Sequence, residues 1–225
     1  MSHAMSHGTK GFLREMRGLR VLAMVVAVMA VVLGARAQAA VVASWNLNGI
    51  DPLQNTVVGA STGVGTLDFG GLGATASVLQ GTALGALKGE VAGDALAAIG
   101  TLANGTSMRI DFATAGYQNL VVSFATRRSA TGASSNRLEC WTGLAWETVF
   151  SFASNATTWE LLSVNLAPMP AFDGGYASMR FVIDGATSSS GSLRFDNISV
   201  SGTPAPAPGA LALLGLAGCI SRRRR

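Results

Sequence analysis

Apolar and polar residues alternate along the second half of the chain in short runs that end at clusters of Gly, Pro, Asn or Ser. In residues 108–112, for example, three apolar side chains alternate with Arg109 and Asp111, so the apolar groups would share one face of a strand. The same pattern predicts seven short strands, over residues 108–112, 120–124, 137–141, 146–152, 160–166, 179–183 and 193–200. Short strands with one apolar face each are typical of a two-sheet antiparallel sandwich.

The first half of the chain shows the alternation less clearly. We expect strands over residues 41–47, 64–69 and 75–79. The Ala-rich stretch 83–99 contains three interior glycines, each of which costs a helix about 1 kcal/mol relative to Ala. It is therefore predicted to be a loop with at most a short helix. Together these elements predict an all-β, jelly-roll-like sandwich over residues 40–202.

The N-terminal segment has the three parts of a secretory signal. Basic residues precede the apolar run 21–33, and small residues at 35–37 or 37–39 suit a signal peptidase. The run is shorter than the roughly 20 residues that a spanning helix needs, which favours cleavage over an uncleaved anchor. Residues 1–39 are interpreted as a signal peptide, with the mature chain starting near Gln38 to Ala40.

The charge of the chain lies mostly in its ends. The stretch 38–221 contains seven Lys or Arg residues against eleven Asp or Glu residues, a net charge of −4. The sequence pI of about 9.7 therefore reflects the two terminal segments. A nucleic-acid partner is not predicted, because its footprint would be a basic patch on the folded domain.

Two common kinds of catalytic site are excluded by the residue inventory. His3 and His7 are the only histidines, and both precede the predicted cleavage point, so the mature chain has no Ser-His-Asp triad and no His-ligated zinc site. A pair of carboxylates, as in glycosidases, is the remaining enzymatic route. The acidic residues considered for it are Glu139, Glu147, Glu160, Asp111 and Asp184.

The C-terminal segment has three parts. Pro204, Pro206 and Pro208 alternate with Ala in a stiff spacer over residues 203–208, an apolar run follows, and the chain ends in a basic cluster. That cluster consists of Arg222, Arg223, Arg224 and Arg225.

This layout resembles the PEP-CTERM sorting signal of bacterial envelope proteins, although Ala stands where that motif has its Glu. The resemblance implies that residues 209–225 form a short hydrophobic sorting helix that anchors the chain transiently in the membrane. It also implies an exosortase-type membrane protease as a partner, with the Arg cluster held on the cytoplasmic side.

Three segments of the body carry a second resemblance. Residues 43–46, 140–149 and 193–202 resemble the first, middle and last strands of jelly-roll domains found on proteins with this tail. Those domains are similar to carbohydrate-binding modules, whose last strand often carries an Asp that helps to hold a structural calcium ion. The resemblance implies an extracellular polysaccharide as a partner.

The last predicted strand changes its period. Apolar residues fall at odd positions up to Phe195 and at even positions from Ile198 onward, so a β-bulge is predicted at Asp196 and Asn197. Asp196 is one candidate ligand for calcium, with Asn46 or Asp51 near the opening strand supplying further hard oxygens. The alternative is that the bulge residues only satisfy backbone groups.

Alternation in residues 137–141 places Arg137, Glu139 and Trp141 on one face. An exposed indole beside charged groups is typical of a sugar-stacking platform; the alternative is that Trp141 covers a sheet edge or packs under a loop. Trp146 is predicted to lie in the core. Arg127 and its neighbour Arg128 either face an acidic glycan or form an ordinary solvated pair.

Three functions from different classes follow from these patterns. The first is a non-enzymatic, exported protein of the bacterial cell surface or extracellular matrix. The second is a carbohydrate-binding module that uses Trp141, with a possible structural calcium ion at Asp196. The third is a carboxylate-dependent glycosidase.

Overall fold

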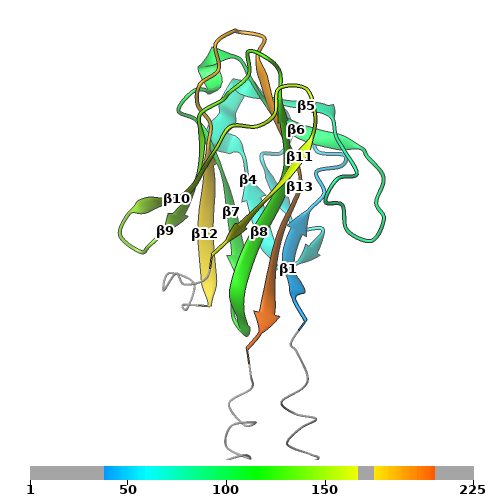
Figure 1. Ribbon diagram of the computed structural model, residues 1–225, viewed down its shortest axis with the longest axis vertical. Helices are drawn as coiled ribbons and strands as arrows, with labels where there is room; N and C mark the ends of the chain where they lie inside the picture. Colours follow the sequence, from blue (N-terminus) through cyan, green and yellow to red (C-terminus); the bar gives the residue numbers. More distant parts are fainter. Residues whose placement is uncertain (1–37, 167–174, 206–225) are drawn as a thin grey trace, which may run out of the picture. The chain divides into compact units, whose positions relative to one another are not determined.

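The computed structural model describes residues 38–166 and 175–205 (Figure 1). In this part of the chain two antiparallel sheets pack face to face as a sandwich, which confirms the predicted all-β fold. No helix among the described residues is long and apolar enough to cross a membrane. The predicted signal sequence up to residue 37, Pro206, Pro208 and the sorting segment 209–225 lie outside the described residues.

The first sheet, sheet A, is built around the long strand β13. In spatial order it contains β11 (Glu160–Asn165), β8 (Tyr117–Arg128), β13 (Ser192–Pro204), β1 (Ala40–Trp45) and β3 (Thr62–Gly63). β6 (Asp94–Ile99) also pairs with β13, and β5 (Ala76–Gln80) pairs with β6.

The second sheet, sheet B, has β12 and β7 near its middle. Its order is β10 (Trp146–Phe152), β9 (Asn136–Trp141), β12 (Tyr176–Val182), β7 (Ser107–Ala113), β4 (Gly65–Asp68) and β2 (Val57–Gly59). Two short 3₁₀ turns, η1 (Gly70–Thr75) and η2 (Thr101–Ala103), complete the described elements.

The core lies between the sheets and is formed by the alternating apolar residues. In β7, Met108, Ile110 and Phe112 have no exposed surface, as the sequence pattern predicts. Aromatic rings from both sheets meet there: Phe124 of β8 and Phe181 of β12 pack edge to face, with ring centroids 4.9 Å apart. Such offset aromatic contacts add to the stabilisation that burial itself provides.

The prediction of a loop over residues 83–99 is wrong for its last six residues, which form strand β6. Ala95 and Leu96 on alternate faces both have no exposed surface, so the strand is buried on both sides. A strand covered on both faces has no polar alternation, and periodicity cannot distinguish it from a buried helix or loop.

The predicted bulge at Asp196 and Asn197 is confirmed. The pairing of β13 with β8 slips between Asp196 and Ser199, and Asn197 adopts a φ of 48°. On the other edge of β13, the bulge lies where the partner strand changes from β6 to β1. The bulge thus lets one long strand join two successive partners.

Strand β13 extends into the first two residues of the predicted linker 203–208. Thr203 and Pro204 form the end of β13, where they pair with Gln118 and Tyr117 of β8. The Thr203 hydroxyl donates to the Gln118 carbonyl at 3.0 Å, which fixes this end of the strand against its neighbour.

Candidate functional site

The face of sheet B that points away from the core carries a row of charged side chains. Arg180 of β12 lies opposite Glu139 of β9 and opposite Arg109 of β7, and Arg109 in turn lies opposite Asp68 of β4. Directly opposite residues of antiparallel strands point to the same face. These four side chains therefore form one row across four strands.

Glu139 connects the predicted residue Arg137 to Arg180. Its Oε1 accepts a hydrogen bond from Arg137 Nε at 3.1 Å, and its Oε2 accepts one from Arg180 Nε at 2.7 Å. Burial raises the pKa of Glu139, but the hydrogen bonds and positive charges of Arg180 and Arg137 outweigh it, so the pKa lies below its usual value. The carboxylate therefore stays ionised.

A second polar group lies beside this row. Arg109 Nε donates to Asp111 Oδ2 at 2.8 Å, and the Ser178 hydroxyl donates to Asp111 Oδ1. Three arginines and three carboxylates thus share this face, and most of their charges are paired within it. These six residues are Arg109, Arg137, Arg180, Asp68, Asp111 and Glu139.

Trp141 and Trp146 lie at one end of the same face. They occupy directly opposite positions on β9 and β10, their ring centroids are 5.5 Å apart, and the rings are inclined at 55°. Trp141 is 39% exposed. Trp141 therefore lies on the same outer face as Glu139, as alternation in residues 137–141 predicts.

The prediction that Trp146 lies in the core is wrong. The register of β10 against β9 slips between Thr148 and Phe150. Trp146 and Thr148 therefore face outward, opposite Trp141 and Glu139, whereas Phe150 lies opposite the buried Leu138. Strict alternation had placed all three on one face because it assumed an unbroken strand.

Arg180 joins the aromatic end of this face to its charged row. The guanidinium carbon of Arg180 lies 4.6 Å from the centroid of the Trp146 ring, a distance that gives an attractive cation–π contact. Beside it is a hollow of about 250 Å³. The hollow is lined by Asp68, Gly71, Ser107, Arg109, Trp146 and Arg180. We call this surface, with Trp141 and Glu139, the tryptophan face.

Asp196 lies away from the tryptophan face, on β13 of sheet A. Its Oδ2 accepts a hydrogen bond from Thr82 N and its Oδ1 one from Asn197 N, both at 2.7 Å. Asp196 is only 1% exposed. Burial raises its pKa to about 6; the two backbone hydrogen bonds lower it, and the charges of Asp94 and Glu90 raise it.

The neighbouring Asn197 anchors the loop 81–93. Its Nδ2 donates to the carbonyls of Thr82, at 2.7 Å, and Leu84, at 3.0 Å. The bulge residues therefore bond backbone groups of this loop.

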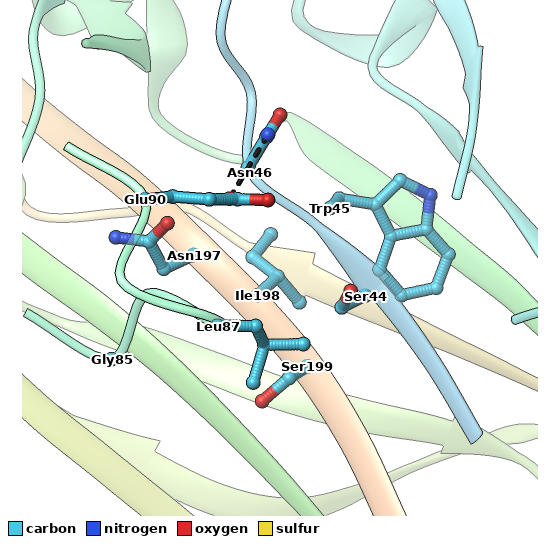
Figure 2. A pocket seen from close by; sticks show the side chains of 9 residues that line it. All are labelled: Ser44, Trp45, Asn46, Gly85, Leu87, Glu90, Asn197, Ile198 and Ser199. Atoms are coloured by element: carbon cyan, nitrogen blue, oxygen red, sulfur yellow. Dashed lines mark hydrogen bonds between the residues drawn. The ribbon is translucent and has the colours of Figure 1, made fainter. Parts of the chain in front are cut away.

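The other candidate calcium ligands occupy different surroundings. Asn46 donates from Nδ2 to Glu90 Oε2 at 3.0 Å, and Figure 2 shows this contact beside a pocket of about 10 Å³, the space of roughly one water molecule. Asp51 accepts a hydrogen bond from Leu53 N in an exposed turn. Over residues 38–166 and 175–205, no three His, Cys, Asp or Glu side chains cluster closely enough to hold a metal ion.

Asn46 and Asp51 do share one surface feature. Both line a hollow of about 350 Å³ along the chain from Trp45 to Ser61, and Asp196 is not among the residues that form it. Calcium binding by Asp196 together with these two residues stays a prediction.

Sequence reasoning missed Arg180 and Trp146 as members of the tryptophan face, and Ser178 as the partner of Asp111 beside it. Alternation within β12 carried a usable signal, because Ser178 and Arg180 are the polar residues between the buried Ala177, Met179 and Phe181. What the sequence did not contain was the strand order that places β12 between β9 and β7.

Comparisons with known proteins give no family and several structures of similar fold. No family model matches the chain, and a search of curated proteins found no match. Among solved structures, the xylan-binding domain CBM22-1 of Paenibacillus barcinonensis Xyn10C is 10% identical, with a TM-score of 0.45 over 76% of this chain and 100% of that one.

Two further structures illustrate the range of these likenesses. TmCBM61, solved in complex with β-1,4-galactotriose, is 11% identical with a TM-score of 0.39, covering 56% of this chain and 81% of that one. The cleaved K2 adhesin domain of Lys-gingipain is 11% identical with a TM-score of 0.37, covering 60% of this chain and 87% of that one. At these values the likeness carries no functional inference.

Proposed function

We propose that this chain is a non-catalytic module that binds a polysaccharide through the tryptophan face. The observation that carries the proposal is the pair of inclined indole rings of Trp141 and Trp146 next to the fixed side chains of Arg180 and Glu139. Indole rings offer flat apolar surfaces to the C–H faces of sugar rings, while charged groups hydrogen-bond hydroxyls.

The charge arrangement favours a neutral sugar. Glu139 is paired with two arginines, and Asp111 with Arg109, so the face offers donors and acceptors with little unbalanced charge. These side chains also hold one another in place before a ligand arrives, which reduces the entropy lost on binding.

Binding without hydrolysis suits the same side chains. A glycosidase needs one carboxylic acid with a raised pKa as the general acid. The pKa of Glu139 is lowered by its arginines, and Asp111 accepts hydrogen bonds from Arg109 and Ser178. Asp196, whose pKa is raised, is buried on the other sheet and beyond reach of a substrate on this face.

The two terminal segments of the chain support an extracellular location for this polysaccharide binding. The signal-like segment 1–39 and the tail that resembles a PEP-CTERM signal favour export and sorting to the bacterial envelope. Signal peptidase and an exosortase-type protease are the processing partners in this proposal, and an extracellular polysaccharide is the ligand.

A polysaccharide-binding screen of the full chain tests the proposal. Trp141→Ala is expected to weaken binding to a neutral polysaccharide about tenfold or more, the scale of a central aromatic contact. Leu102→Ala removes a side chain that is 84% exposed on η2 and serves as the matched control with unchanged affinity. Equal affinity of the wild type and Trp141→Ala would remove the site.

The screen also separates the first two functions. If the wild-type chain binds no polysaccharide, the function that remains is that of a structural protein of the cell surface or matrix. Repeating the screen with calcium and with chelator tests the calcium prediction for Asp196.

A further inference from the structure

The outer face of sheet A carries two arginines side by side. Arg194 of β13 lies directly opposite Arg127 of β8. The flanking residues Leu193 and Phe195 are buried in the core, so Arg194 points to the opposite, outer face, and Arg127 points the same way. Both side chains are partly exposed.

This arginine pair has no acidic partner among the described residues. The ion pairs in that part of the chain belong to Arg109, Arg137 and Arg180 on sheet B. Arg194 Nη1 donates only a long hydrogen bond of 3.4 Å to the Gln80 carbonyl. Burial and then the positive charge of Arg127 lower the pKa of Arg194, as expected where a second guanidinium stands close by.

Nearby groups do not neutralise the pair. The row across sheet A continues from Arg194 to the uncharged Ala97 and Ser77. Asp196 follows two residues after Arg194 on β13, but both of its oxygens accept hydrogen bonds from the backbone of Thr82 and Asn197.

The next arginine in the sequence shows the contrast. Arg128 donates from Nε to the Ser154 carbonyl at 2.8 Å and from Nη1 to the carbonyls of Ser129 and Ala130. Its donors are therefore used within the fold, whereas those of the arginine pair are largely free to meet a ligand. Like charges placed directly opposite on a sheet destabilise it, so the pair carries a cost that a bound anion would remove.

We infer that Arg127 and Arg194 bind an oxyanion, the carboxylate or sulfate group of an acidic polysaccharide, at a second site on the sheet opposite the tryptophan face. Guanidinium groups present planar pairs of donors that match carboxylate and sulfate oxygens. This site does not depend on sugar binding at the tryptophan face.

Titration of the full chain with three polymers tests the inference: polygalacturonate for carboxylate, dextran sulfate for sulfate, and dextran as the neutral control. Because both chain ends are basic, Arg222→Gln is the matched control for loss of one charge elsewhere. Arg127→Gln and Arg194→Gln are each expected to weaken binding to an acidic polymer about tenfold. Arg222→Gln should change it less than about twofold.

The polymers and a further variant separate the possible results. Arginine-dependent binding of one acidic polymer identifies carboxylate or sulfate as the ligand group, and binding of both supports a general oxyanion site. Arg127→Gln should cause the same fold-loss of acidic-polymer affinity in the wild type and in the Trp141→Ala background, so a failure of the sugar site can be told apart from a failure of the arginine site. Absence of binding to both acidic polymers, or equal losses in all three arginine variants, would overturn the inference.

Stability without a ligand gives an independent measurement. Removing one of two facing charges should raise the melting temperature of Arg127→Gln at low ionic strength, and added salt should shrink the gain by screening. Arg128→Gln should instead lower the melting temperature, because its three carbonyl acceptors lose their donors. A salt-independent or negative effect of Arg127→Gln would contradict the repulsive pair on which the site depends.

Discussion

At the scale of single residues, the tryptophan face depends on Glu139. This carboxylate is 6% exposed and bonded to Arg137 and Arg180, and through Arg180 it fixes the cation that packs on Trp146. Its role could be predicted only in part from the sequence, because alternation groups Glu139 with Arg137 and Trp141 but contains no information on the strand that supplies Arg180.

Glu139→Gln should lower the free energy of unfolding by roughly 1.5–3 kcal/mol at pH 7, the range for hydrogen bonds to charged groups. The folded-state pKa of Glu139 lies below its usual value of 4.5. Its contribution is therefore present above about pH 4.5 and lost as the pH falls through the folded-state pKa. Urea unfolding of both proteins between pH 3 and pH 7 should show their difference shrinking in acid.

Glu147 is exposed on β10, so Glu147→Gln serves as the control and should change stability little at any pH. A difference between wild type and Glu139→Gln that stays constant down to pH 3 would show that the ionised carboxylate is not what stabilises this network.

At the scale of elements, bulges decide where side chains point. The slip in β10 places Trp146 beside Trp141, and the slip in β13 places Asp196 and Asn197 under the loop 81–93. The second slip could be predicted, because the apolar period changes from odd to even positions. The first could not, because the apolar Trp146 and Phe150 fit an unbroken alternation equally well. Strand β6 was missed because it is buried on both faces.

Substitutions at Asn197 test whether its side chain anchors the loop 81–93 to the bulge in β13. Asn197→Gly permits the φ of 48° but removes the hydrogen bonds to Thr82 and Leu84, and it should destabilise the fold by roughly 1–2 kcal/mol. Asn197→Ala should cost about 1 kcal/mol more, because Ala is strained at positive φ. Hydrogen exchange should show faster opening of the loop 81–93 in both variants.

Asn119→Gly is the matched control, since Asn119 also has a positive φ, of 52°, and is exposed. It should leave exchange in the loop 81–93 unchanged. If the loop in Asn197→Gly exchanges as slowly as in the wild type, the side-chain bonds to Thr82 and Leu84 do not anchor it.

At the scale of the whole molecule, the two outer faces of the sandwich differ in their charges. On sheet B, the outer arginines and carboxylates are paired with one another. On sheet A, Arg127 and Arg194 face each other without an acidic partner among the described residues, and the nearby Asp196 is buried. The fold class follows from strand alternation and turn residues. The distribution of charge between the faces does not, because it depends on strand order and register.

Asp196 should make global stability depend on pH. Its pKa rises from 3.8 to about 6 on folding, so its contribution is fully present below about pH 3.8 and lost as the pH rises through 6. The wild-type free energy of unfolding should therefore fall between pH 4 and pH 7 relative to that of Asp196→Asn. Urea unfolding across this range measures the difference, and equal pH slopes in the two proteins would contradict the burial of an ionisable Asp196.

The indole N–H signals of the four tryptophans give the most direct test of the tryptophan face. They would be assigned in the full chain and followed by NMR while an oligosaccharide of a bound neutral polysaccharide is added. We expect the Trp141 and Trp146 signals to shift and saturate together, while that of Trp45, which is 1% exposed, does not move. Saturable sugar binding that leaves both Trp141 and Trp146 unshifted would rule out the tryptophan face as the sugar site.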